Sequence, residues 1–203
     1  MKLRAEPSFI VTIATLLLTN EPKYVIFMLF SAFVHEVGHI VAMKVCGVKI
    51  NTLVLGFFGG TVIMEKKLIS YGKEAFIAFS GPFVNLIFST LFFIIMRSGF
   101  SADIFFLFLC NIFYGVFNLL PIGTLDGGAV LKSLLARKKE LYTVDRTMNI
   151  LSRITLFLLG TFSIFLVSMS AFNISLLAVT LLFYAESTEG HIISGYEFCR
   201  RTS

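Results

Sequence analysis

The stretch YVIFMLFSAFVHEVGHIVAMKVC, residues 24–46, decides the fold of this chain. It is long and apolar enough to cross a bilayer as a helix, and Gly47 follows it, as is common at a helix C-terminus. The pentapeptide HEVGH, residues 35–39, places two histidines and a carboxylate inside this apolar segment. Ionisable groups are costly at that depth and usually serve a function there. The stretch therefore predicts a membrane helix that carries a reactive site.

The composition of the whole chain is also that of a membrane protein. Of the 203 residues, 57% are hydrophobic and 14% are charged, whereas a soluble domain is about 45–50% apolar and about 25% charged. The bilayer is therefore the predicted solvent, and the net charge of +5 is attributed to membrane orientation rather than to nucleic-acid binding. The three cysteines have no metal-ligand spacing and imply no disulfide framework.

The apolar runs predict an α-helical polytopic membrane protein with about six transmembrane helices in a single domain. The expected spans are residues 8–20, 24–46, 75–96, 104–120, 154–169 and 172–185. No small-x-small cleavage site follows the first span, so we interpret it as a helix rather than a signal peptide, although the sequence leaves open whether it is retained. Asp145 and Arg146 are expected to lie in a charged loop that faces water.

Residues 50–64 are expected to form a small membrane-embedded β segment instead of a helix. They contain Gly56, Gly59 and Gly60 among Val, Leu, Phe and Thr, which suits two short strands around the glycines. Irregular backbone at membrane depth survives only where protein or water covers it. Two interpretations remain open: a strand edge that pairs with an extended substrate peptide, and a re-entrant hairpin that only packs.

The positions of Lys and Arg predict the orientation in the membrane. With six spans, the loops opposite the termini contain only Lys23 and Arg97, so 17 − 2 = 15 basic residues lie on the side of the termini. The positive-inside rule then predicts an integral protein of a bacterial-type cytoplasmic membrane, with both termini cytoplasmic. The basic run 137–139 is interpreted as part of this signal, with an acidic partner or anionic lipid as the alternative.

HEVGH has the H-E-x-x-H pattern of zinc peptidases. Because residues i and i+4 share one face of a helix, His35 and His39 can reach the same Zn²⁺. Glu36 would then hold a water molecule whose pKa the zinc lowers to about 7, and would accept its proton. A chance pentapeptide is the alternative, but two of the chain's three histidines flank a carboxylate deep in an apolar span, which favours function.

A catalytic zinc needs a third protein ligand and an open fourth position. The candidate is Asp126, in the stretch NLLPIGTLDGG at residues 118–128. Pro121 and Gly123 break a helix there and expose backbone, which is typical of membrane segments that line a site. The alternative role of Asp126 is the N-cap of a helix over residues 127–135, and the pairing with H-E-x-x-H favours the ligand.

Together, H-E-x-x-H in one span and N-x-x-P-x-x-x-x-D-G some eighty residues later resemble the motifs of the site-2 proteases, and the resemblance covers essentially the whole chain. It implies one Zn²⁺ per chain held by His35, His39 and Asp126, with Glu36 as the catalytic base. It also implies that Asn118 lies near the scissile carbonyl and stabilises the oxyanion.

Smaller cues resemble the stage IV sporulation protein FB branch of this family. They are FGGTV at residues 58–62 and the stretch 118–128, whereas the Gly-Pro-x-x-Asn element at residues 81–85 resembles the family as a whole. Implied substrate-binding residues are Gly59, Gly60, Thr61, Asn85 and Pro121. That branch cleaves a membrane-tethered pro-sigma factor and often carries a CBS domain, whereas this chain is expected to contain neither a CBS nor a PDZ domain.

The expected partners are the lipid bilayer, a single-span membrane protein substrate of the pro-sigma or anti-sigma type, and a membrane inhibitor. A catalytically silent zinc-binding scaffold is the alternative function. Glu36 argues against it, because zinc binding does not need that residue. A metal transporter is also disfavoured, because transporters spread ionisable residues over several helices and the third, fifth and sixth expected spans have no charge at all.

Overall fold

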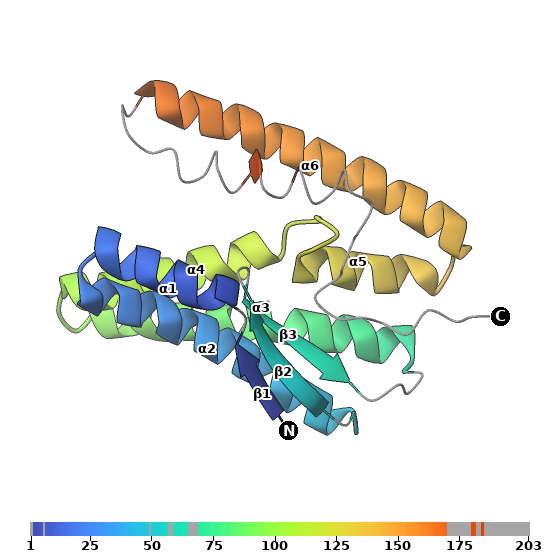
Figure 1. The fold of residues 1–203 in the computed structure, drawn as a ribbon, viewed down its shortest axis with the longest axis horizontal. Coiled ribbons are helices and arrows are strands. Elements are labelled where there is room, and N and C mark those ends of the chain that lie inside the picture. The colour runs from blue at the N-terminus through green and yellow to red at the C-terminus, as the bar shows by residue number, and fades with distance from the viewer. Residues whose placement is uncertain are drawn as a thin grey trace.

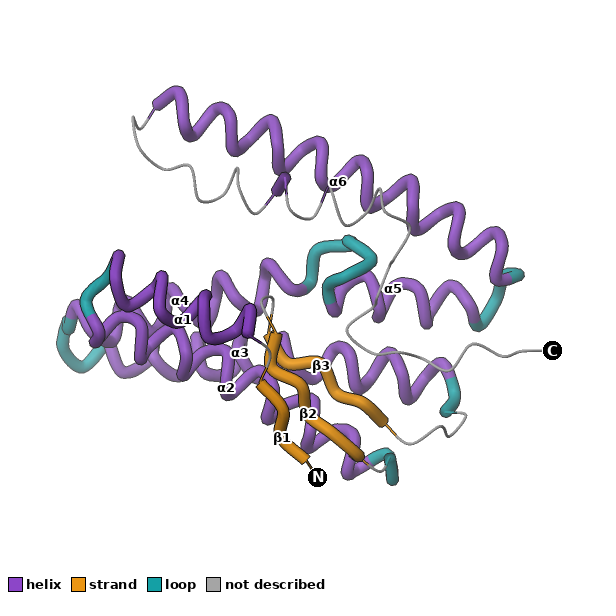
Figure 2. Tube along the Cα trace, viewed as in Figure 1, coloured by secondary structure: helices purple, strands orange, loops and turns teal. Residues whose placement is uncertain are grey.

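The computed structural model describes residues 2–5, 7–48, 50–56, 59–64, 69–169, 180–181 and 184. These residues form a helical bundle with a small sheet on one side (Figures 1 and 2). The elements in chain order are β1 Lys2–Ala5, α1 Pro7–Thr19, α2 Pro22–Val45, β2 Ile50–Gly56, β3 Gly59–Met64, α3 Tyr71–Met96, α4 Ala102–Asn118, α5 Asp126–Ala136 and α6 Leu141–Met169.

Three of these helices are long and apolar enough to cross a membrane: α2, α3 and the Leu141–Ser168 part of α6. Helix α4 is apolar but shorter, and α1 has 13 residues, which is about 20 Å of helix. The expected span at residues 172–185 lies almost wholly outside the described residues. The structure therefore shows a membrane-type helical bundle, while the number of six spans stays a prediction.

The expected charged loop before residue 154 is wrong. Asp145 and Arg146 lie in α6, which begins at Leu141, and the Asp145 carboxylate pairs with Lys132 Nζ of α5 at 2.8 Å. Val144 and Met148, one turn apart on the same helix, are 0% and 4% exposed. The first turns of α6 are therefore helical because one face buries apolar side chains, while the charged residues lie on the other faces of the helix.

Helix α2 ends in a Schellman motif, which fixes where the HEVGH helix stops. Gly47 has a φ of 71°, and its N–H donates to Lys44 O at 3.0 Å, while Val48 N–H donates to Met43 O at 2.9 Å. This is the bond pattern expected when a glycine takes the left-handed position after a helix. Val48 and Met43 both belong to the buried apolar core.

Helix α3 is the centre of the bundle and packs against α2, α4 and α5. Its Ile77 and Ala78 are fully buried against Ala42 and Met43 of α2 and Ala129 of α5. At the α2–α3 crossing, Gly38 lies so close to α3 that a Cβ would be 2.8 Å from Ser80 O and 3.1 Å from Gly81 Cα. Small residues allow such close approach of helices in membrane bundles. Here they let the side of α2 that carries the HEVGH motif lie directly against α3.

The segment expected to contain extended structure forms strands β2 and β3. They pair antiparallel, with Val54 opposite Thr61 and Gly56 opposite Gly59, and β1 pairs parallel with the other side of β2. The strand order β1-β2-β3 makes β3 an edge strand among the described residues. Strand β2 also contacts α1.

Much of the surface of the bundle is apolar. Exposed large side chains on the long helices include Phe33, Phe83, Phe157, Phe162 and Ile94, each with 49–71% of its surface accessible. A soluble protein rarely exposes apolar side chains so densely, whereas a bilayer solvates them. The exposed faces therefore agree with the hydropathy of α2, α3 and α6.

Candidate metal centre

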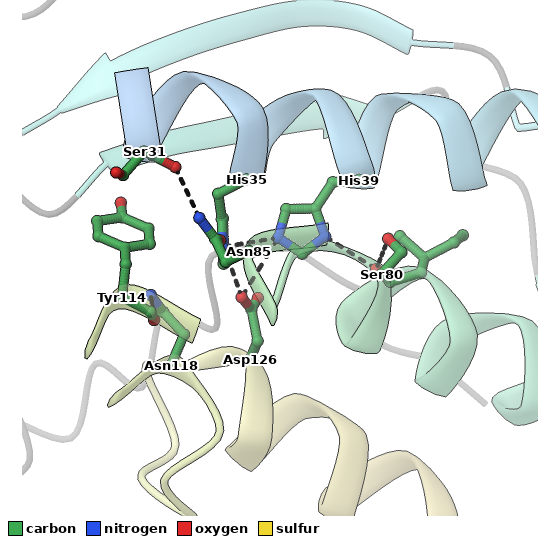
Figure 3. A network of polar contacts seen from close by, with 9 residues as sticks. Ser31, His35, His39, Ser80, Asn85, Tyr114, Asn118 and Asp126 are labelled. Atoms are coloured by element: carbon green, nitrogen blue, oxygen red, sulfur yellow. Dashed lines mark hydrogen bonds and ion pairs between the residues drawn. The ribbon is translucent and has the colours of Figure 1, made fainter. Parts of the chain in front are cut away.

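Three ligand-type side chains from two separate parts of the chain meet inside the bundle. His35 and His39 lie one turn apart on α2, and Asp126 is the first residue of α5. Figure 3 shows the two imidazoles on one side and the Asp126 carboxylate facing them from the other. The two histidines are 3% and 2% exposed and Asp126 is 9% exposed, and their ligand atoms all lie within 4.8 Å of one another.

The distances between these atoms suit one small metal ion. His35 Nε2 lies 3.0 Å from His39 Nε2, and Asp126 Oδ2 lies 2.9 Å from the first and 3.3 Å from the second. Ligands bound at about 2.0–2.1 Å around a tetrahedral zinc lie about 3.3 Å from each other. The three atoms are therefore placed close to the spacing that zinc requires.

The opposite edge of each imidazole fixes which nitrogen faces the metal. His35 Nδ1 is 2.7 Å from Asn85 Oδ1, and His39 Nδ1 is 2.8 Å from the carbonyl oxygen of Ile77. Both partners accept, so both Nδ1 atoms carry the proton and both Nε2 atoms present a lone pair. Metal-binding histidines commonly have this arrangement, in which the second nitrogen donates to an oxygen.

The chemistry of the three ligand atoms shows that a metal ion fits between them. Two imidazole lone pairs 3.0 Å apart, with a carboxylate oxygen beside both, repel one another unless a cation lies between them. Gly81 of α3 leaves space for that cation, since a Cβ there would lie 2.8 Å from His35 Nε2 and even closer to His39 Nε2. The residues therefore fit a zinc ion held by two imidazoles and one carboxylate.

The loop between α4 and α5 determines the position of Asp126. Two glycines, Gly127 and Gly128, allow the first turn of α5 to lie directly on this loop, because a Cβ on either would overlap the carbonyls of Leu119 and Ile122. The N-cap of α5 is Leu125, so the alternative in which Asp126 is the N-cap is wrong. Asp126 instead lies inside the first turn and extends toward the histidines.

Helix α6 holds the same loop from its other side. Gly123 N–H donates to Ser152 Oγ at 3.1 Å, and that hydroxyl donates to Pro121 O at 3.4 Å. Ser152 is 5% exposed, and Leu156, one turn further along α6, packs on Ile122. Helix α6 thus supports the loop that places the third ligand.

Glu36 lies beside the metal ligands on α2. It follows His35 directly, its residue surface is partly exposed, and its Oε2 atom is shielded from solvent. A general base needs this position, next to the metal but reachable by the substrate.

Asn118 and Asn85, which were also predicted as site residues, have side-chain amides that hydrogen-bond to other parts of the protein. Asn118 Nδ2 donates to Tyr114 O of its own helix at 2.9 Å, so the amide is bound to α4 while lying next to the site (Figure 3). Asn85 was expected to bind substrate, but it is fully buried. Its amide contacts His35, Ser31 and Asn111, so its position is behind the metal ligand.

The other predicted substrate-binding residues lie in two different places. Pro121 is in the loop before α5, where its carbonyl accepts the Ser152 hydroxyl. Gly59, Gly60 and Thr61 lie on β3, opposite Gly56, Leu55 and Val54 of β2. The structure therefore places these three on an edge strand and leaves their contact with substrate as a prediction.

Sequence reasoning missed three polar residues around the site: Ser31, Asn111 and Tyr114. The Tyr114 ring lies edge-on to His35, with centroids 4.9 Å apart. The overlooked signal was helical periodicity, because polar side chains recur at spacings of three or four on apolar helices. The polar stripes are Ser31, His35 and His39 on α2; Asn85 and Ser89 on α3; and Asn111, Tyr114 and Asn118 on α4.

Comparisons with known proteins agree with this geometry. The model of peptidase family M50 matches residues 23–100 and 95–162. A zinc metalloprotease of Methanocaldococcus jannaschii is 32% identical over 187 residues, which are 87% of this chain and 52% of that protein. The protein Rip3 of Mycobacterium tuberculosis is 32% identical over 122 residues, which are 56% of this chain and 31% of Rip3. The chain thus spans about half or less of these relatives.

A solved structure has the same fold. The site-2 protease from Methanocaldococcus jannaschii superimposes with a TM-score of 0.61 at 25% sequence identity, covering 92% of this chain and 89% of the other.

Proposed function

This chain belongs to peptidase family M50, and from that premise we propose that it is an intramembrane zinc endopeptidase of the site-2 protease type. It would hydrolyse a peptide bond within or next to the membrane segment of its substrate. One observation carries this proposal: His35 Nε2, His39 Nε2 and Asp126 Oδ2 converge within a bundle whose helices are apolar enough to span a membrane.

The chain's own residues supply the proton transfers. A zinc ion held by His35, His39 and Asp126 would act as the Lewis acid that acidifies a water molecule and polarises the scissile carbonyl. Glu36 would accept the proton of that water and deliver it to the leaving amine. Asn118 would stabilise the oxyanion after its amide turns away from Tyr114 O, its present acceptor.

We further propose that the substrate binds in an extended form along β3. A peptide bond in a helix is shielded, so the substrate must unwind before it is cut, and an edge strand offers hydrogen bonds that replace those of the helix. Among the described strands, β2 is paired on both sides and β3 on one. The outer edge of β3, which includes Gly59, Gly60 and Thr61, is the side available for such pairing.

The substrate class proposed here is a single-span membrane protein, such as a tethered pro-sigma or anti-sigma factor, with a membrane inhibitor as a further partner. The relatives described above are named as a zinc metalloprotease and a site-2 protease, so the sporulation branch stays a prediction.

The proposed orientation places both termini in the cytoplasm. Two contacts support the alternation of helix directions that this topology needs. Lys23 at the start of α2 pairs with Asp103 at the start of α4, so the second and fourth helices begin at the same end of the bundle. At the other end, Lys73 Nζ of α3 donates to Cys46 O after α2 at 3.1 Å. Reporter fusions at the two termini test the orientation, and a periplasmic signal from either end would contradict it.

A co-expression assay with the Glu36→Gln variant tests the function. Wild type and variant are each expressed with tethered pro-sigma and anti-sigma substrates, and cleavage and zinc per chain are measured. We expect wild type to cut and the variant to bind zinc without cutting, because Gln keeps the shape of Glu but accepts no proton. If both bind zinc and neither cuts any single-span substrate tested, the result favours the alternative of a zinc-binding scaffold and reopens the question of the substrate class.

A further inference from the structure

A buried polar network from three helices contacts the side of His35 that faces away from the metal site. Its members are Ser31 of α2, Asn85 of α3 and Asn111 of α4, which are 1%, 0% and 0% exposed. Figure 3 shows the part that joins Ser31, Asn85 and His35. Buried polar groups at membrane depth are costly unless each donor meets an acceptor. The direction of every hydrogen bond in the network therefore follows from its fixed ends.

The polarity of Asn111 is determined by two acceptors. Its Nδ2 lies 2.9 Å from Leu107 O and 3.0 Å from Ser31 Oγ. The Ser31 hydroxyl proton is itself donated to Phe27 O at 3.1 Å, so Ser31 Oγ accepts from Asn111. If the amide oxygen and nitrogen of Asn111 were exchanged, Oδ1 would lie against the Leu107 carbonyl oxygen, and the two acceptors would repel each other. Asn111 Oδ1 therefore points toward Asn85.

The polarity of Asn85 follows in the same way. Its Nδ2 donates to Ser31 O at 2.9 Å and to Asn111 Oδ1 at 3.0 Å, and both of these partners accept. Its Oδ1 is then the atom that lies 2.7 Å from His35 Nδ1. An oxygen at that position requires the proton of His35 to be on Nδ1, which leaves Nε2 free to bind a metal.

We propose that Asn111 and Ser31 are positioning residues which act through Asn85 to keep His35 in the Nδ1–H form that binds metal. The carbonyls of Phe27, Ser31 and Leu107 fix the polarity, and the two amides transmit it to the ligand. The network also fixes the rotation of the His35 ring, because Asn85 is held by α2 and α4 at once.

His39 does not depend on this network. Its Nδ1 donates directly to the backbone carbonyl of Ile77 at 2.8 Å, and that oxygen also accepts the Ser80 hydroxyl at 2.6 Å. Changes at Asn111 or Ser31 should therefore affect His35 and leave His39 unchanged. The chain has three histidines in all, so selective labelling of histidine resolves each ring.

The test uses the full chain in detergent, labelled with ¹⁵N-histidine, as wild type, Asn111→Leu and Ser31→Ala. Ser89→Ala is the control, since Ser89 is a 2% exposed serine on α3 that takes part in none of the contacts above. Two quantities are measured: the affinity for zinc by competition with a chelator, and the exchange with water of each histidine Nδ1–H proton.

We expect Asn111→Leu to weaken zinc binding by about 10-fold or more, as loss of a group behind a metal ligand does. The Nδ1–H of His35 should exchange faster while that of His39 does not, and Ser89→Ala should change neither quantity. Unchanged zinc affinity together with equal exchange at both histidines would overturn the proposal. If Asn111→Leu does not fold, the same His35-to-His39 comparison in Ser31→Ala decides.

This inference rests on the proposed metal site, and the two fail differently. If wild type binds no zinc, the proposed function fails. If wild type binds zinc and the variants bind it equally well, only the positioning role fails.

Discussion

At the scale of single residues, Gly81 matters as much as the ligands. The Cβ of any other residue would lie 2.8 Å from His35 Nε2 and closer still to His39 Nε2, the two nitrogen atoms that would bind the metal. Gly81 belongs to α3, whereas the histidines belong to α2. The close crossing of α2 and α3 therefore places a residue without a side chain next to the position where the metal would bind.

The first prediction concerns this space. We expect Gly81→Ala to reduce bound zinc from about one per chain to near zero, because the added methyl group occupies the position of the ion. Zinc per purified chain, measured by atomic absorption, checks this. Gly72→Ala is the matched control on the same helix, because no atom lies within 4 Å of a Cβ at Gly72. Equal zinc in both variants would contradict the steric role of Gly81.

The ligands themselves could be predicted from the sequence, but their supports could not. H-E-x-x-H and the distant Asp126 carry a chemistry that residue type and spacing reveal. Asn85 matched a motif, yet its role behind His35 depends on which face of α3 meets α2. Asn111 and Ser31 belong to no motif that we recognised. Their contacts arise only when three helices pack, which is a property of tertiary structure.

At the scale of elements, α6 acts as a support for the loop that carries Asp126. The loop has only short-range turns of its own, such as Leu125 N–H to Ile122 O at 2.9 Å. Ser152 adds a donor and an acceptor from outside, to Pro121 O and Gly123 N–H. Two glycines at the start of α5 complete the packing.

A second prediction follows for Ser152. Replacing it with Ala leaves the Gly123 N–H without its acceptor, a loss of about 1–3 kcal/mol when the group is buried. We expect faster hydrogen exchange in residues 119–125 and weaker zinc binding in Ser152→Ala. Ser163→Ala is the control: Ser163 is also buried on α6, but its hydroxyl bonds Leu159 O and Thr180. The account is wrong here if the loop of Ser152→Ala exchanges as it does in Ser163→Ala.

A third prediction concerns β3 as the strand that binds substrate. Successive N–H groups of a strand point to opposite edges, so one of Thr61 and Val62 donates toward β2 and the other toward the open edge. Proline removes a backbone donor. We expect proline at the outward position to reduce cleavage while zinc content stays unchanged, and hydrogen exchange identifies that position. Full cleavage by this variant would support the alternative of a hairpin that only packs.

The elements were predicted unevenly, for a physical reason. Continuous apolar runs predicted α2 and α3 closely, because a helix that crosses a bilayer needs about 20 predominantly apolar residues in succession. The start of α6 was missed, because its first turns combine the buried Val144 and Met148 with the exposed charges of Asp145 and Arg146. Such a mixed pattern lacks the uniform hydrophobic run by which a membrane helix is recognised in a sequence.

At the scale of the whole molecule, function depends on bringing residues 35–39 and 126 together, and α3 accomplishes this. Helix α3 packs against α2, α4 and α5, so it aligns the two ligand-bearing segments with each other (Figure 1). No local pattern in the sequence contains this arrangement. The pairing of the two motifs predicted that they meet, and the structure shows which helix mediates the contact.

The most direct test of the central claim is the coordination of zinc in the purified full chain. Zinc per chain is measured together with X-ray absorption at the zinc edge, for wild type and for Asp126→Ala. The account predicts one zinc per wild-type chain, bound by two imidazole nitrogens and by oxygen at about 2.0–2.1 Å, and a large loss of zinc in Asp126→Ala. A wild-type chain without zinc, or zinc bound equally well without Asp126, would contradict it.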